Sequence, residues 1–101
     1  MRIQQLQYLE TIVQTGSINE AAKKLYLTQP SLSNAIKELE AEMGIQILLR
    51  SKLGVTLTDE GREFMIYARQ VLDQVQLLKG RYEKDTTVKQ AFQFQRSTMP
   101  L

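Results

Sequence analysis

Apolar residues recur every three or four positions along four segments of the chain, and this spacing predicts four helices that each bury one face. The first helix lies within residues 1–15 and ends at Gly16. Its apolar stripe consists of Ile3, Leu6, Leu9, Ile12 and Val13. We expect this helix to be scaffold that closes a three-helix core, and we expect Gln4, Gln5 and Gln7 to be solvated.

The second helix is expected directly after Gly16, because Ser17-Ile18-Asn19-Glu20 forms a Ser-x-x-Glu capping box. It is about two turns long, and the small side chains of Ala21 and Ala22 would let another helix cross it closely. A turn of about three residues separates it from Thr28, where the third helix begins. A short helix, a tight turn and a second helix together make a helix-turn-helix unit.

The third helix, residues 29–43, has signals at both ends. Thr28 offers an oxygen to the first free amides, and Gly44 is typical of a residue at which a helix stops. Its apolar stripe is Leu32, Ile36, Leu39 and Met43. Its other face carries Gln29, Pro30, Ser33, Asn34, Lys37 and Ala41. The first turns of this face carry small side chains that can form hydrogen bonds, which suits a helix end that approaches base-pair edges. If the segment stood alone, an ordinary amphipathic helix would be the favoured interpretation.

After Gly44 the hydrophobic period changes to alternation, which predicts a β-hairpin, or wing, over residues 45–57 with Gly54 at its turn. Its alternating apolar residues are Ile45, Ile47, Leu49, Val55 and Leu57. Arg50 and Lys52 lie on its flank and tip. Either residue alone would be an ordinary solvated cation, but beside the third helix both suit contacts with a nucleic-acid backbone or minor groove.

The fourth helix begins after Thr58, and its first-turn carboxylates Asp59 and Glu60 complement the helix dipole. The apolar residues that follow with heptad spacing are Phe64, Ala68, Val71, Val75, Leu78 and Tyr82. Leu72 widens this stripe. A helix over 59–84 would be about 40 Å long, which exceeds the width of a small domain. We therefore expect it to pair two copies of the chain.

Composition narrows the chemistry. The 101 residues include no cysteine and no histidine, which excludes disulfides, Cys/His zinc sites and histidine acid–base catalysis. We expect no catalytic residue, no metal and no cofactor. The formal net charge is only +2, so a nucleic-acid footprint must come from the placement of the cations. No apolar run is long enough to span a membrane and no signal core opens the chain, so we expect a cytoplasmic protein.

The run Thr28-Gln29-Pro30-Ser31-Leu32-Ser33 carries a specific family resemblance. Together with Gly16 through Leu25 before it, and Leu57-Thr58-x-x-Gly61 after it, it resembles the LysR-type transcriptional regulators. The resemblance implies an all-α fold with a small β-wing: a winged helix-turn-helix over 1–58 and a linker helix for dimerisation over 59–87. Residues 88–101 would then be a tail, and 93–97 would be the first strand of an effector-sensing domain that is otherwise absent.

This resemblance implies a regulator that binds double-stranded DNA as a homodimer at an interrupted inverted repeat, with a small-molecule effector acting only through the missing domain. Association beyond the dimer stays open. The candidate base-contacting residues are Gln29, Ser33 and Asn34, with Pro30 against a thymine methyl or sugar. The candidate phosphate-contacting residues are Thr28, Ser31, Lys37, Arg50 and Lys52. Asn34 stands where many relatives have arginine, which favours an adenine contact, or no base contact, over a guanine contact.

Two other functions compete with DNA binding. A helical adaptor would use the long helix to bind another protein, but the wing and the small polar face of the third helix argue against it. An enzyme would need a nucleophile, a metal cluster or a phosphate loop, and none stands out in the sequence.

Overall fold

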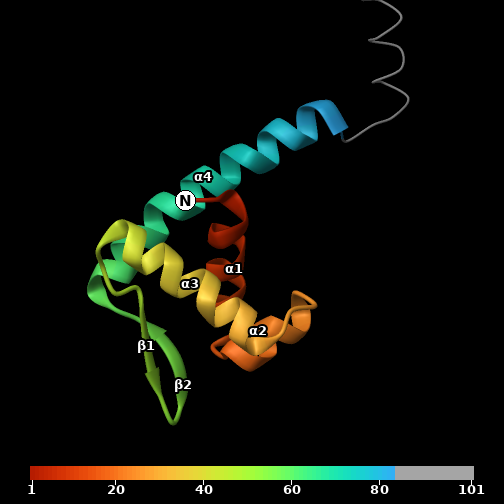
Figure 1. The fold of residues 1–101 in the computed structure, drawn as a ribbon. Helices are drawn as coiled ribbons and strands as arrows, with labels where there is room; N and C mark the ends of the chain where they lie inside the picture. The colour runs from red at the N-terminus through yellow and green to blue at the C-terminus, as the bar shows by residue number, and fades with distance from the viewer. Residues whose placement is uncertain (84–101) are drawn as a thin grey trace, which may run out of the picture.

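The computed structural model describes residues 1–83 of the chain. Four helices and one hairpin follow in the predicted order (Figure 1). The helices are α1 (Ile3–Thr15), α2 (Ile18–Lys24), α3 (Gln29–Met43) and α4 (Asp59–Glu83), and the strands are β1 (Leu48–Ser51) and β2 (Gly54–Leu57). The predicted all-α fold with a small β-wing is confirmed. The expected strand over 93–97 and the linker residues after 83 lie outside the described residues.

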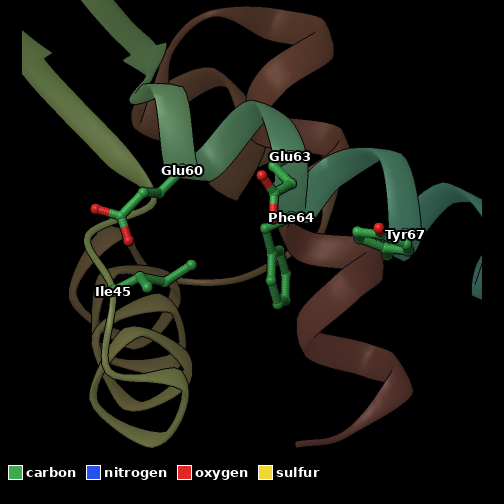
Figure 2. A pocket seen from close by; sticks show the side chains of 5 residues that line it. All are labelled: Ile45, Glu60, Glu63, Phe64 and Tyr67. Atoms are coloured by element: carbon green, nitrogen blue, oxygen red, sulfur yellow. The ribbon is translucent and has the colours of Figure 1, made fainter.

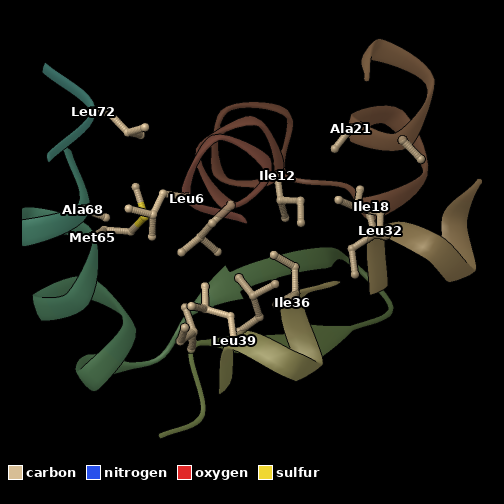
Figure 3. Close-up of a cluster of buried hydrophobic side chains, with 14 residues drawn as sticks. Leu6, Ile12, Ile18, Ala21, Leu32, Ile36, Leu39, Met65, Ala68 and Leu72 are labelled. Atoms are coloured by element: carbon tan, nitrogen blue, oxygen red, sulfur yellow. The ribbon is translucent and has the colours of Figure 1, made fainter. Parts of the chain in front are cut away.

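The core lies around α1, which packs against α2, α3 and α4 (Figure 3). Leu6, Leu9 and Ile12 of α1 are almost completely buried, and they meet Leu32 and Ile36 of α3 in one cluster. Burying an aliphatic side chain of this size contributes roughly 1.5–3 kcal/mol. The scaffold role expected for the first helix follows from this central position.

The helix caps form where the sequence predicts, but only half of the expected Ser17–Glu20 capping box is present: the Ser17 amide donates to Thr15 Oγ1 at 3.4 Å, and the Glu20 carboxylate lies 3.5 Å from the Lys23 ammonium. Ser17 accepts a hydrogen bond from the Glu20 amide at 3.2 Å, and Thr28 accepts one from the Ser31 amide at 3.2 Å. Gly16 and Gly44 end α1 and α3 with φ angles of 70° and 71°, in the left-handed region that glycine enters most easily. These local signals therefore set both ends of the helix-turn-helix.

The prediction for Gln5 is wrong. Its side chain is only 4% exposed, and it joins the start of α1 to α3. The Arg2 amide donates to Gln5 Oε1 at 2.8 Å, and Gln5 Nε2 donates to the carbonyl of Ala35 at 3.2 Å. A polar side chain at this buried position is stable because both ends of its amide have partners.

The hairpin forms, but the expected alternation is wrong in its first strand. Ile47 and Leu48 are both buried, whereas Leu49 is 48% exposed. Glu40 of α3 holds this part of the chain, since its Oε2 accepts hydrogen bonds from the amides of Ile47 at 2.7 Å and Leu48 at 3.2 Å. The ladder with β2 begins at Leu48 and Leu57, and the Thr58 amide also donates to the Ile47 carbonyl at 2.9 Å just before it.

The wing is fastened to the body of the domain at Gly16. The Val55 amide donates to the Gly16 carbonyl at 3.1 Å. Gly54, at φ 124°, passes so close that a Cβ there would lie 2.6 Å from the same oxygen. A side chain at position 54 would therefore push the hairpin away from the turn between α1 and α2.

The start of α4 is packed equally tightly. Thr58 Oγ1 accepts a hydrogen bond from the Gly61 amide at 2.8 Å, which confirms Thr58 as the cap. A Cβ on Gly61 would collide with the carbonyl of Ile47, so only glycine lets α4 lie against the chain before β1. From there α4 crosses α1 and runs away from the wing (Figure 1).

Candidate nucleic-acid interface

The N-terminal half of α3 presents an open, polar surface. The exposed candidate residues on or beside this helix are Thr28, Gln29, Pro30, Ser31, Asn34 and Lys37. Thr28 and Ser31 also bond each other, because the Thr28 hydroxyl donates to Ser31 Oγ at 2.8 Å while Thr28 caps the Ser31 amide. The helix therefore begins with a preorganised hydroxyl pair, next to two exposed amide side chains and one ammonium group.

Ser33 does not belong to this open surface, which corrects the expectation that it faces outward. Its side chain is 6% exposed. The hydroxyl oxygen accepts hydrogen bonds from Gln29 Nε2 at 3.0 Å and from Arg50 Nη2 at 3.4 Å. Covered by these two longer side chains, Ser33 holds groups that can reach a ligand but does not present its own hydroxyl.

The two wing cations differ in their surroundings. Arg50 lies on β1 opposite Val55, and its guanidinium reaches back to α3 through Ser33. Lys52 lies in the two-residue turn beyond the ladder, beside the fully exposed Leu53. Within residues 1–83 the Lys52 ammonium has no hydrogen-bond or ion-pair partner. Arg50 is thus held in position by a hydrogen bond, whereas the exposed Lys52 side chain is held by no such bond in the part of the chain that the structure describes.

The carboxylates of α3 point away from this surface. Glu42 bonds the N-terminal ammonium at 2.6 Å, and Glu38 lies 3.5 Å from the guanidinium of Arg2. Glu40 is engaged with the amides before β1. The three acids thus contact the N-terminus, Arg2 or the start of the hairpin. Within residues 1–83, none of them pairs with Lys37 of α3 or with the wing cations Arg50 and Lys52.

Tyr26 is an exposed residue that the sequence analysis passed over. It lies in the turn between α2 and α3 with φ 57°, and its side chain is 95% exposed. Left-handed backbone is costly for a bulky residue and is retained where the surroundings impose it. Here the neighbouring Leu27 amide is tied to the carbonyl of Ala22, which fixes the turn. The sequence offered one signal for Tyr26: it is a large aromatic residue in a tight turn, where glycine or asparagine is more usual.

The long helix α4 has two apolar stripes rather than one. Gly61, Met65, Ala68 and Leu72 are buried against the domain. Ala68 and Leu72 were expected in the dimerisation seam, so their placement in the core of a single copy is a correction. Its outward face exposes Ile66, Tyr67, Val71, Leu77, Leu78 and Tyr82. Phe64 and Val75 are half-buried at the boundary between these two faces.

Beside the first turns of α4 the surface is hollowed. A pocket of about 160 Å³ is lined by Ile45, Glu60, Glu63, Phe64 and Tyr67. Figure 2 shows the Phe64 ring beside Ile45, with the two carboxylates on the neighbouring turns of α4. The pocket adjoins the outward apolar face, and its lining combines apolar side chains with two carboxylates.

Residues 1–83 contain no group of histidine, cysteine, aspartate or glutamate side chains arranged to hold a metal ion. None of the helices described is long and apolar enough to cross a membrane.

Comparison with known proteins shows to which family this fold belongs. The family model described as a bacterial regulatory helix-turn-helix protein of the lysR family matches residues 3–62, which include the whole helix-turn-helix and the wing. The chain belongs to the LysR family. The resemblance predicted from the run Thr28–Ser33 and its flanks is confirmed.

Relatives in the family are regulators by name. The nitrogen assimilation regulatory protein nac of Klebsiella aerogenes is 42% identical over 74 residues, covering 73% of this chain and 24% of the relative. The HTH-type transcriptional regulator CzcR of Bacillus anthracis is 37% identical over 79 residues, covering 78% of this chain and 27% of the relative. The chain thus spans about a quarter of the length of these curated relatives.

Solved structures show the same fold in the presence of DNA. The complex of CbnR_DBD with DNA matches with a TM-score of 0.75 and 33% identity, over 80% of this chain and 93% of that one. The complex of BenM_DBD with catB site 1 DNA matches with a TM-score of 0.76 and 38% identity, over 80% and 91%.

Proposed function

We propose that this chain binds double-stranded DNA in a sequence-selective manner and regulates transcription, catalysing no reaction. The observation that carries the proposal is the polar, acid-free N-terminal half of α3 beside the cationic wing, on a fold shared with domains solved on DNA. The first turns of α3 enter the major groove, and the wing lies along the backbone or in the minor groove. Bacterial DNA lies in the cytoplasm, and the chain would act there.

The exposed residues fall into groups according to the part of the DNA that each would contact. Gln29 and Asn34 carry amides that can donate and accept at once, which suits the N6 and N7 atoms of adenine. Pro30 contacts a thymine methyl or a sugar. Lys37, Arg50 and Lys52 meet phosphates, together with the hydroxyl pair of Thr28 and Ser31. Ser33 supports this set from beneath, since it is covered by Gln29 and Arg50.

The outward face of α4 supports a homodimer. Its apolar residues Val71, Leu78 and Tyr82 are exposed in one copy, and together with their neighbours they form a larger apolar surface than the isolated residues normal for a monomer. The inward stripe, Met65 through Leu72, is already buried by the domain. Pairing through the outward face would therefore leave each domain intact.

The charges along α4 favour antiparallel pairing. Glu60, Tyr67, Gln74 and Arg81 recur every seven residues along one edge of the outward face. Reversing one helix brings Glu60 near Arg81 of the second copy, whereas a parallel pair would place like charges side by side. The same reversal brings Tyr82 toward the pocket beside Phe64. Two recognition helices related by a twofold axis fit an interrupted inverted repeat, with one per half-site.

Selection of bound duplexes from a random pool tests the proposal directly. We expect enrichment of an inverted repeat whose half-sites lie about one helical turn apart or a multiple of that spacing. Enrichment of no sequence over random DNA would contradict selective binding and would favour the adaptor function, which uses α4 alone. Control by a small-molecule effector would require a further domain, and it forms part of the proposal only for a longer protein.

A further inference from the structure

Ser33 lies where the recognition helix and the wing meet, and it touches both of the long side chains that cover it. We propose that Ser33 couples the wing to the base-reading end of α3, so that Arg50 affects which base Gln29 prefers. The inference rests on the DNA-binding function proposed above. It assigns Ser33 a positioning role in place of the base contact expected from the sequence.

The Ser33 hydroxyl has enough hydrogen-bond capacity to hold both side chains. A serine oxygen has two acceptor sites, and here Gln29 Nε2 and Arg50 Nη2 both point hydrogens at it. The Gln29 amide keeps a second N–H and its Oε1. One donor and one acceptor are what a bidentate contact with adenine requires. Ser33 therefore holds the amide in place without consuming the groups that would contact the base.

The wing strand is held rigidly at Arg50. Arg50 pairs with Val55, and the Val55 amide is bonded to the Gly16 carbonyl at 3.1 Å. A guanidinium has five N–H donors, so one can bind Ser33 while others remain for a phosphate. A phosphate contact at Arg50 would thus be felt at Gln29 through one shared oxygen. At 3.4 Å, the Arg50 link is the longer of the two bonds to Ser33.

Lys52 differs from Arg50 in its surroundings. It carries the same formal charge on the same hairpin, yet it lies beyond the ladder, and within residues 1–83 it makes no hydrogen bond to α3, unlike Arg50. Lys52 is therefore the matched control. Loss of its charge should weaken binding to every duplex alike, whereas loss of Arg50 should also change the preference among bases.

The test measures binding to the selected site with each of the four bases at the pair that Gln29 contacts, which is the pair whose preference flattens in Gln29→Ala. We expect Arg50→Ala to reduce discrimination at that pair by about threefold or more, and Lys52→Ala to leave it unchanged. Ser33→Ala should cause the same reduction, and adding Arg50→Ala to it should reduce discrimination no further. Ser33→Thr, which keeps the hydroxyl, should restore the preference.

Two controls keep the result interpretable. Thr11→Ala removes a hydroxyl from α1 that bonds only the Gln7 carbonyl, and it should leave base preference unaltered. If Ser33→Ala fails to fold, the nearly isosteric Ser33→Cys takes its place, and the Arg50 comparison stands by itself. Equal losses for all four bases in Arg50→Ala, with selective wild-type binding, would overturn the coupling alone. A wild-type protein that binds no duplex selectively would contradict both the coupling and the proposed function.

Discussion

The helices α3 and α4 bury their inner faces in the same way and differ in what they expose. Each has apolar residues at spacings of three and four packed against α1, from Leu32 to Leu39 in one and from Met65 to Leu72 in the other. Outward, α3 presents amides, hydroxyls and a cation, whereas α4 presents large apolar side chains. The inner faces of both helices therefore build the core of the domain, and the proposed function assigns the two outer faces to different partners.

Disrupting the outer face of α4 should produce the largest effect. Val71→Glu with Leu78→Glu puts two charges into the proposed seam, where they would be desolvated without partners. We expect monomers at micromolar concentration and a loss of at least about tenfold in affinity for the selected site, since one half-site contact is lost. Sedimentation equilibrium and duplex titration measure the two effects. A monomeric wild-type protein would refute the dimer.

Disrupting the inner face of the same helix should act on folding instead. Met65 is almost fully buried against α1. Met65→Ala should lower the free energy of unfolding by about 2–5 kcal/mol, because the cavity refills only in part. Chemical denaturation checks the value. Ile66→Ala, one position along and exposed, is the matched control and should change stability by about 0.5 kcal/mol or less.

On α3 the outer face should matter for sequence preference and not for folding. Gln29→Ala should cost roughly 1–3 kcal/mol on the best site and almost nothing on random DNA, because it removes a base contact. Its thermal midpoint should stay near that of the wild type, since the side chain is exposed. Parallel titrations of the selected and random duplexes measure the difference. A similar loss on both duplexes would mean that Gln29 contacts only the backbone.

The smallest effect is expected at the wing tip. Lys52→Ala should weaken selected and random duplexes alike and should lower the slope of log K against log salt by about one, as for one lost phosphate contact. Titrations at several salt concentrations give the slope. A changed base preference with an unchanged slope would show that Lys52 enters a groove.

The helices, their caps and the wing were predictable because their signals are local. Capping at Ser17 and Thr28, and the stop at Gly44, depend on residues within one turn. The family was predictable for the same reason, because the resemblance rests on the short run Thr28–Ser33 and its flanks. Periodicity also placed Gln29 and Asn34 on the open side of α3.

What escaped prediction depends on neighbours distant in sequence. Gln5 is buried because it meets Ala35, and Ser33 is buried because it meets Arg50, across separations of thirty and seventeen residues. The alternation expected for the first strand fails at Ile47 and Leu48, where both side chains are buried and both amides are bound by Glu40 of α3. Ala68 fits the heptad seam by spacing and Leu72 lies beside that seam, yet the domain of a single copy buries both side chains. Spacing predicts an apolar stripe but not which surface covers it.

The most direct test of the central claim is the binding of the wild-type and Gln29→Ala proteins to every single-base variant of the selected site. If the outer face of α3 recognises bases, the wild type should discriminate at symmetric positions in both half-sites. Gln29→Ala should lose that discrimination at one pair per half-site and keep it elsewhere. Equal losses across all variants would contradict the account, because α3 would then only be positioned on the DNA and would recognise no base through Gln29.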